Sequence, residues 1–281
     1  MMRCGSKVMP SPRPREPCDP SSESSPGPSE LVEQGAHGSL VGVIAVLDYG
    51  IGNLGSACKA LVSLGCDARL VSDPATVGGA AGVVLPGVGA FGRCMEALRG
   101  TGLDAVVKEV VGGGVPFLGI CVGFQMLYES SEESPEVPGL GLLPGRVGLL
   151  PPGQKRPQMQ WNALEPRSGT SAMLAGLGPR PWVYFVHSFA PVPAGWGPDR
   201  PAVGAVVATC DYGGPVVAAV EQGNLWAVQF HPEKSGTTGL ALLANFARRC
   251  GEEVPGVPAA SRAGGKFAAA RIRVGAPDMG A

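Results

Sequence analysis

The sequence predicts an α/β fold with a mostly parallel central sheet flanked by helices. Two observations predict it. In the first half of the chain, short apolar runs that end in turn residues alternate with segments whose apolar residues recur at helical spacing, a pattern typical of a parallel sheet with helices on both faces. The composition of the 281 residues, 44% hydrophobic and 16% charged, is also sufficient for a sizeable core.

Strands and helices alternate through the first half of the predicted fold. Strands are expected at residues 41–47, 67–71, 82–85 and 116–120, each a short apolar run bounded by turn residues. Helices are expected between and after them, at residues 53–64, 91–111 and 122–128. Gly65 ends the first helix, and Pro86-Gly87 breaks the third strand.

The second half is richer in strands. Runs typical of β-structure cover residues 182–190, 203–209, 216–220 and 225–230. The turn signals Gly213-Gly214-Pro215 and Gln222-Gly223-Asn224 separate the last three of them. A helix at residues 238–249 is expected to close the domain, which we place at residues 41–252.

The two ends of the chain differ from this domain. Residues 1–40 are rich in Pro, Ser and Glu, and residues 253–281 in Gly, Ala and Pro, without apolar periodicity. Such segments bury too little apolar surface to offset the entropy lost on ordering, so both are predicted to be disordered tails. No secretory signal is recognisable in the first tail, which is either a disordered extension or a translation start assigned too far upstream.

Charge, apolar runs and cysteines exclude several classes of function. A net charge of −1 gives no general attraction to nucleic acid or to an acidic membrane, and no stretch approaches 18 uninterrupted apolar residues. The eight cysteines include no C-x-x-C pair, and a domain of this size does not need disulfides. We therefore expect a cytoplasmic protein without a metal site or a cofactor.

The strongest local signal is Gly119-Ile120-Cys121-Val122-Gly123, between a predicted strand and a predicted helix. This G-x-C-x-G pattern is the thiol form of a nucleophile elbow, in which a tight strand-to-helix turn holds the nucleophile. Small residues on either side let the neighbouring chain approach, and the helix N-terminus favours a thiolate. The N–H of Val122 would point to a developing oxyanion. The alternative is a buried cysteine flanked by turn glycines.

A thiol nucleophile usually needs a base, most often a histidine, and the chain has three. His37 lies in the predicted tail and His187 within a predicted strand, where it can be an ordinary buried histidine. His231 follows a predicted strand, and Glu233 two residues later can accept a hydrogen bond from its ring, as the third member of a triad does. The alternative for Glu233 is a solvated carboxylate paired with Lys234.

A glycine-rich loop at residues 85–92 follows another predicted strand. Its spacing matches neither G-x-x-x-x-G-K-[ST] nor G-x-G-x-x-G, so a phosphate-binding role is not indicated. If this loop lies beside Cys121, the backbone N–H of Val88 or Gly89 can supply a second oxyanion donor.

Taken together, these motifs resemble the class I glutamine amidotransferases. Asp48-Tyr49-Gly50-Ile51-Gly52-Asn53-Leu54, residues 85–92, Tyr184-Phe185-Val186-His187-Ser188 and Phe230-His231-Pro232-Glu233-Lys234-Ser235-Gly236 narrow the resemblance to the glutaminase subunits of imidazole glycerol phosphate synthase, in histidine biosynthesis. The resemblance covers about residues 43–250. Several separate motifs in the expected order make it specific.

The resemblance implies a reaction, a partner and further site residues. Cys121 would attack the carboxamide of glutamine, with His231 as base and Glu233 as its orienting residue. The released ammonia would pass to a (β/α)-barrel cyclase subunit in a heterodimer. Four residues are expected to hold glutamine, namely Gln125, Glu133, His187 and Ser188. Three are expected at the partner interface, namely Asn53, Trp161 and Tyr184.

One segment departs from the family pattern. Near residues 157–162, which face the partner in the family, a His and a Gly are usual where this chain has Gln158 and Gln160. Two alternatives remain open: another class I glutaminase or γ-glutamyl hydrolase, and a non-catalytic subunit that only binds a partner. The Lys-Ser-Gly after Glu233 is against the first, and the intact Cys, His and Glu are against the second. Core or surface packing is the alternative role for Trp161, Tyr184 and Gln125.

Overall fold

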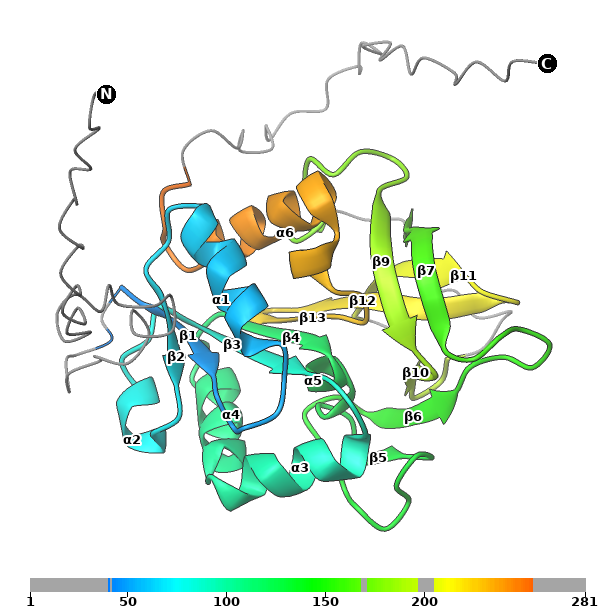
Figure 1. The fold of residues 1–281 in the computed structure, drawn as a ribbon, viewed down its shortest axis with the longest axis horizontal. Coiled ribbons are helices and arrows are strands. Elements are labelled where there is room, and N and C mark those ends of the chain that lie inside the picture. Colours follow the sequence, from blue (N-terminus) through cyan, green and yellow to red (C-terminus); the bar gives the residue numbers. More distant parts are fainter. Residues whose placement is uncertain (1–39, 41, 168–170, 197–204, 255–281) are drawn as a thin grey trace, which may run out of the picture. The chain divides into compact units, whose positions relative to one another are not determined.

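The computed structural model describes residues 40, 42–167, 171–196 and 205–254 (Figure 1). Leu40 and Val254, at the two ends of this part, are buried against the hydrophobic core. Residues 1–39 and 255–281 lie outside the described residues, so the two tails stay a prediction.

The described residues contain an eight-stranded mixed sheet. Its strands in spatial order are β2 (Ala68–Val71), β1 (Ile44–Leu47), β3 (Gly82–Gly87), β4 (Phe117–Cys121), β13 (Leu225–Val228), β12 (Pro215–Gln222), β11 (Val206–Asp211) and β8 (Glu165–Pro166). The first five are parallel, and each of the last three is antiparallel to its neighbour. The predicted central sheet is therefore confirmed, with an antiparallel extension at one edge.

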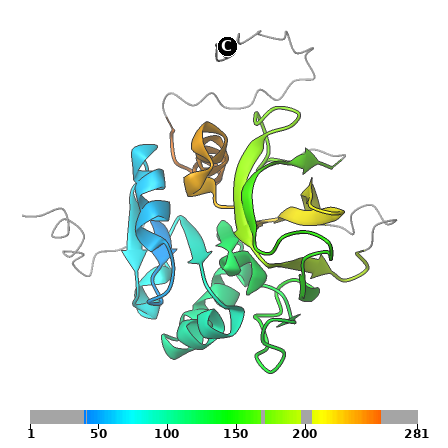
Figure 2. The same ribbon diagram turned by 45° about the vertical axis from the view of Figure 1, so that its right-hand side comes forward.

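Helices cover both faces of this sheet (Figures 1 and 2). Helices α1 (Leu54–Ser63) and α6 (Gly236–Arg249) lie together on one face, and α3 (Phe91–Gly100) and α4 (Leu103–Gly112) on the other. The short helix α2 (Pro74–Val77) connects β2 to β3. Helix α6 buries residues at helical spacing, and its Phe246 packs on Trp226 of β13 with ring centroids 6.1 Å apart. Burial of this apolar face, more than helix propensity, fixes α6 on the sheet.

Two of the predicted helices differ in the structure. The helix expected at 91–111 is two helices, because Gly102 adopts a left-handed backbone (φ 75°) and Thr101 bonds back to the carbonyl of Leu98. The helix expected at 122–128 is only one turn, α5 (Val122–Gln125), and a turn follows it. Left-handed glycine is a common way to end a helix, so the first break has a visible sequence signal.

The apolar run at 182–190, predicted as one strand, belongs to two sheets. Strand β9 (Trp182–His187) pairs with β7 (Gln158–Ala163), and β10 (Phe189–Pro193) pairs with β6 (Gly145–Leu149). Strand β6 also pairs with β5 (Ser130–Ser131). The run divides at Ser188, whose carbonyl accepts a hydrogen bond from Leu150. Its two halves pair with different strands, and the sequence of residues 182–190 alone does not show this difference in pairing.

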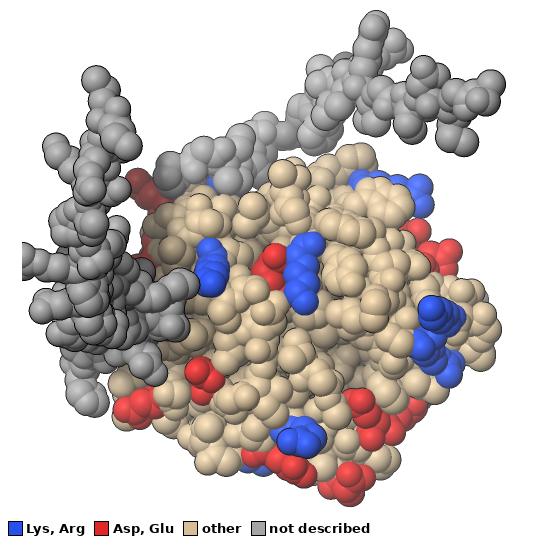
Figure 3. All heavy atoms as spheres, viewed as in Figure 1, with Lys and Arg blue, Asp and Glu red and all other residues tan. Residues whose placement is uncertain are grey.

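On the face shown in Figure 3, no large area of the described surface carries charged side chains of only one sign. There, Lys and Arg side chains are interspersed with Asp and Glu over the described residues. Within the described ranges, no helix combines the length and apolar character that crossing a bilayer requires.

Candidate active site

Cys121 lies at the end of β4, directly before α5, in a strained backbone conformation. Its φ of 56° makes it the one non-glycine residue with positive φ in the described part of the chain. The turn is packed closely against β3, since a Cβ built on Gly123 would lie 1.9 Å from the carbonyl oxygen of Leu85. Only a glycine at 123 allows this approach, and the surrounding sheet holds Cys121 in its unfavourable conformation.

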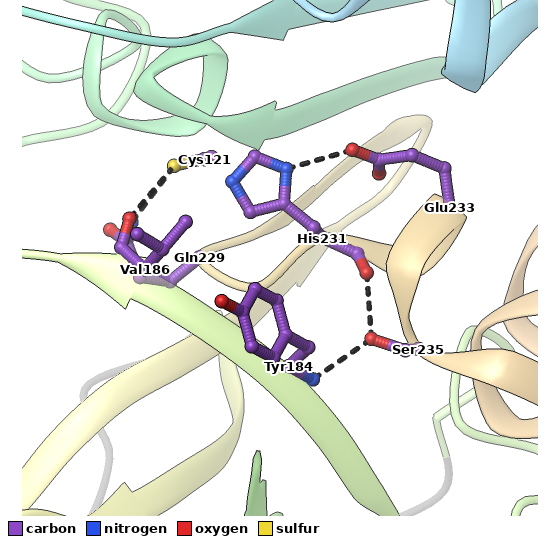
Figure 4. A network of polar contacts seen from close by, with 7 residues as sticks. All are labelled: Cys121, Tyr184, Val186, Gln229, His231, Glu233 and Ser235. Atoms are coloured by element: carbon purple, nitrogen blue, oxygen red, sulfur yellow. Dashed lines mark hydrogen bonds and ion pairs between the residues drawn. The ribbon is translucent and has the colours of Figure 1, made fainter. Parts of the chain in front are cut away.

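His231 and Glu233 follow β13, the strand beside β4 in the sheet. The ring Nδ1 of His231 lies 2.8 Å from Oε1 of Glu233, and both side chains are 2% exposed. The other ring nitrogen, Nε2, is buried without a protein partner and faces the sulfur of Cys121 (Figure 4). Glu233 thus accepts the Nδ1 proton and leaves Nε2 directed at the Cys121 sulfur.

The backbone around His231 is fixed by strand β9. The N–H of His231 donates to the carbonyl of Tyr184 (3.0 Å), and Ser235 Oγ accepts from the N–H of Tyr184 (3.0 Å). The same hydroxyl donates to the carbonyl of His231 at 2.6 Å (Figure 4). Ser235 and Tyr184 therefore hold the turn that carries the histidine.

Electrostatics favour the protonated form of His231. Burial lowers the pKa of its imidazole, but the interactions with Cys121 and Glu233 outweigh burial and raise the pKa to about 10. His187 shows the opposite behaviour: burial is the largest influence and lowers its pKa to about 4. One histidine of the site is therefore suited to carry a proton at neutral pH, and the other stays neutral.

A cavity of about 570 Å³ opens over Cys121 and His231. Its lining includes the three expected oxyanion residues and the four expected to hold glutamine, namely Val88, Gly89, Val122, Gln125, Glu133, His187 and Ser188. Glu233 is not part of the lining, because it lies behind the His231 ring. The structure thus brings residues from seven separate segments to one cavity at the carboxyl ends of β3, β4 and β13, where ligands of parallel sheets commonly bind.

The expected glutamine-binding residues have defined orientations. Gln125 Nε2 donates to the carbonyl of Phe189 at 2.9 Å. Glu133 Oε2 accepts from the N–H of Phe91 at the start of α3 (2.8 Å). His187 Nδ1 lies 2.8 Å from the carbonyl of Phe189, which can only accept, so the proton is on Nδ1 and Nε2 is free to accept.

Comparisons with known proteins identify the family. The family model for glutamine amidotransferase class-I matches residues 45–250. The chain belongs to the class I glutamine amidotransferase family. The curated relatives of this amidotransferase include imidazole glycerol phosphate synthase subunit HisH of Deinococcus radiodurans, which is 49% identical over 73% of this chain and 93% of its own length. HisH of Synechococcus elongatus is 48% identical over 72% of the chain and 91% of its own length.

Solved structures agree on the fold. A crystal structure of a glutamine amidotransferase matches 75% of this amidotransferase and 100% of its own chain, with a TM-score of 0.57 and 27% identity. PurLQS from Thermotoga maritima matches 73% and 97% of the respective chains, with a TM-score of 0.57 and 20% identity. The class I amidotransferase fold predicted from the sequence is confirmed, as is the HisH relationship.

The residues expected at a partner interface do not share one environment. Trp161 of β7 is 49% exposed and lies opposite Tyr184 of β9, with ring centroids 6.1 Å apart. Asn53, in contrast, lines the cavity. Of the two departures from the family pattern, Gln160 is exposed, but Gln158 is fully buried, with its Nε2 3.9 Å from the sulfur of Cys210. The expectation that the Gln158 side chain faces a partner is wrong, because other parts of the described chain cover that side chain completely.

Sequence reasoning missed Gln229. This fully buried residue contacts Cys121, with Nε2 3.7 Å from the sulfur (Figure 4). A signal was present: Gln229 precedes His231 by two residues at the end of a strand, and residues two apart in extended chain point to the same side. No cluster of three or more potential metal ligands occurs among the described His, Cys, Asp and Glu residues.

Proposed function

We propose that Cys121, His231 and Glu233 form the catalytic triad with which this amidotransferase hydrolyses glutamine to glutamate and ammonia. One observation carries the proposal: the imidazole of His231 is held by Glu233 through Nδ1 and directs a buried, unpaired Nε2 at Cys121. A nucleophile, a base and a residue that orients the base are the parts that acyl transfer through a thioester requires.

In the first half of the reaction, the thiol proton of Cys121 moves to His231 Nε2. The sulfur then attacks the carboxamide carbon of glutamine, and the carbonyl electrons move to oxygen. The N–H groups of Val122 and of Val88 or Gly89 stabilise the resulting oxyanion. When the carbonyl re-forms, the carbon–nitrogen bond breaks, His231 gives its proton to the departing nitrogen, and ammonia leaves behind a thioester.

Water completes the cycle. His231, now neutral, takes a proton from a water molecule that attacks the thioester carbon. The second oxyanion collapses, the carbon–sulfur bond breaks, and the thiolate is restored beside the imidazolium of His231. The new carboxylic acid loses its remaining proton to solvent and leaves as glutamate. The raised pKa of His231 suits both halves of the reaction. In the first half the imidazolium protonates the departing nitrogen, and in the second it forms again when His231 takes a proton from water.

The polar groups around the cavity suit the charged α-amino acid end of glutamine and its neutral carboxamide. A carboxylate has several acceptor positions, so Glu133 can accept from the substrate ammonium while it also accepts from Phe91. Gln125, His187 and Ser188 line the same space and supply polar contacts for the rest of the substrate. We assign these four residues to glutamine binding.

The ammonia is supplied to a cyclase subunit that makes imidazole glycerol phosphate and aminoimidazole carboxamide ribotide in histidine biosynthesis. The relatives that support this partner are themselves named subunits of imidazole glycerol phosphate synthase. We propose a heterodimer in which Trp161 and Tyr184 of the β7–β9 sheet contact the cyclase, with Asn53 at the edge of the cavity near it. We place the reaction in the cytoplasm, because the nucleophile must stay reduced and the six described cysteines are free.

The test is glutamate release from glutamine by the purified chain, alone and with a cyclase subunit and its nucleotide substrate. Release by the complex that Cys121→Ala abolishes and Cys66→Ala leaves intact is the expected result, because Cys66 is an equally buried cysteine remote from the cavity lining. Equal release without the cyclase would keep the triad and remove the proposed coupling. Release by the Cys121→Ala complex would exclude the triad.

A further inference from the structure

Gln229 joins two parts of the site that the triad does not connect. Its backbone N–H donates to the carbonyl of Ala218 on the neighbouring strand, which fixes the residue in the sheet. Its side chain is fully buried and has two contacts: Nε2 donates to Cys121 Sγ at 3.7 Å, and Oε1 accepts from Gln125 Nε2 at 3.0 Å. A buried amide with both ends engaged is held in one orientation.

The direction of this chain of hydrogen bonds is set by the backbone. The carbonyl of Phe189 can only accept, so the Gln125 amide must turn its NH₂ group toward it. The second hydrogen of that NH₂ group is then donated to Gln229, which must present its oxygen there. The NH₂ group of Gln229 is consequently left facing Cys121, as the donor the sulfur contact requires.

We propose that Gln229 is a positioning residue of the glutaminase site, whose amide N–H groups favour the thiolate of Cys121 and whose oxygen holds Gln125 in its substrate-binding position. This inference rests on the triad function proposed above. Gln229 has no role in the transfer of protons, because an amide neither gains nor loses one at neutral pH.

Besides His231 and Gln229, the sulfur has a third neighbour, which opposes the thiolate. The carbonyl oxygen of Val186 lies 3.9 Å from Cys121 Sγ on the same side of the site (Figure 4). A carbonyl accepts from a thiol but repels a thiolate, so by itself it favours the unreactive form. The Gln229 amide acts in the opposite direction, since a hydrogen bond to the charged form favours that form.

Two substitutions separate the two contacts. Gln229→Glu has nearly the same shape, and one carboxylate oxygen can still accept from Gln125, but the other places negative charge toward Cys121. Gln229→Met keeps the volume and removes both contacts. Replacement by methionine also keeps the core packed, so it provides a second variant if the buried carboxylate prevents folding.

The first readout is the pH dependence of Cys121 alkylation by iodoacetamide, followed by mass spectrometry of the Cys121 peptide in the complete chain. We expect Gln229→Glu to move the alkylation midpoint upward by about one pH unit or more, and Gln229→Met to move it upward by less.

The second readout is steady-state glutamine hydrolysis by the complex with the cyclase. There, Gln229→Glu is expected to lower kcat at least about tenfold with a smaller change in KM, whereas Gln229→Met also raises KM severalfold because Gln125 loses a partner.

The two proposals fail in different ways. If neither folded variant changes the alkylation midpoint relative to the wild-type chain, Gln229 does not act on the sulfur and the inference is wrong. A buried glutamine with a purely structural role would change the unfolding midpoint without changing the alkylation profile. If the wild-type complex releases no glutamate, the triad function fails, yet the alkylation profile still reports whether Gln229 acts on Cys121.

Discussion

Buried polar atoms without a protein partner gather at the candidate site. Five such side-chain atoms occur among the described residues, and three belong to His187, His231 and Glu233. An unpaired buried donor or acceptor costs on the order of 1–3 kcal/mol of folding free energy. Most buried polar atoms in folded proteins are therefore hydrogen-bonded. The two histidines line the cavity, where a substrate can complete the hydrogen bonds of their Nε2 atoms, whereas Glu233 lies behind His231.

At neutral pH, His187 contributes to stability as a neutral residue. Its pKa is about 4 in the folded chain, against an ordinary 6.5. Below pH 6.5 the unfolded chain binds a proton that the folded chain does not, so this contribution is complete above pH 6.5 and is lost as the pH falls toward 4. We expect a loss of about 2 kcal/mol between pH 7 and pH 5 from this residue.

Urea unfolding of the wild type and of His187→Gln at pH 7 and pH 5 measures this loss. Other groups also titrate in this range, so the relevant quantity is the difference between the two proteins in their change of unfolding free energy. The non-titrating variant is expected to lose about 2 kcal/mol less than the wild type. Parallel losses in both proteins would show that His187 titrates normally in the folded state.

At the scale of elements, the tight turn of the G-x-C-x-G segment depends on the contact between β3 and the start of α5. A Cβ on Gly123 would lie 1.9 Å from the Leu85 carbonyl oxygen, and backbone cannot move aside as a flexible side chain can. Gly123→Ala is therefore expected to lower the free energy of unfolding by at least about 1–3 kcal/mol, the usual effect of overpacking. Guanidinium or urea unfolding curves measure it.

The matched control for this prediction is Gly55→Ala in α1. Gly55 is exposed and helical, and a Cβ built there meets no atom within 4 Å. Alanine is the better helix former, so this variant should equal or exceed the wild type in stability. Equal stability of the two alanine variants would contradict the steric explanation of the G-x-C-x-G pattern.

The sequence predicted the elements that depend on local signals. The strands leading to Cys121 and His231 are continuous apolar runs that end in turns, and such runs identify buried parallel strands. Strands β6 and β7 were not predicted, because only Val147 and Gly148 of β6 are buried and residues 159–161 of β7 are exposed. The division at Ser188 depends on pairing with these two strands, which is a property of the tertiary structure.

At the scale of the whole molecule, the site is formed where distant segments meet. Cys121 and Gln229 are 108 residues apart in sequence and come together because β13 inserts beside β4 in the sheet. The sequence motifs placed Cys121 and His231 directly after two strands, so their meeting at one edge of the sheet could be expected, and the triad they suggest remains a proposal. The contacts of Gln229 were not predicted, because strand order is not encoded near any one residue.

The β7–β9 sheet carries an exposed apolar surface that we define by Met159, Trp161 and Trp182, which are 61%, 49% and 54% exposed. Exposed aromatic and methionine side chains of this kind are typical of protein interfaces. Truncation of a central tryptophan commonly costs about 2 kcal/mol of binding free energy, roughly thirtyfold in Kd.

We expect Trp161→Ala to weaken binding to the cyclase by that amount in isothermal titration calorimetry, with the unfolding free energy unchanged. Leu149→Ala is the control, because Leu149 is 46% exposed but belongs to β6 in another sheet. An equal Kd for wild type and Trp161→Ala would move the partner to a different face of the molecule and leave the catalytic proposal intact.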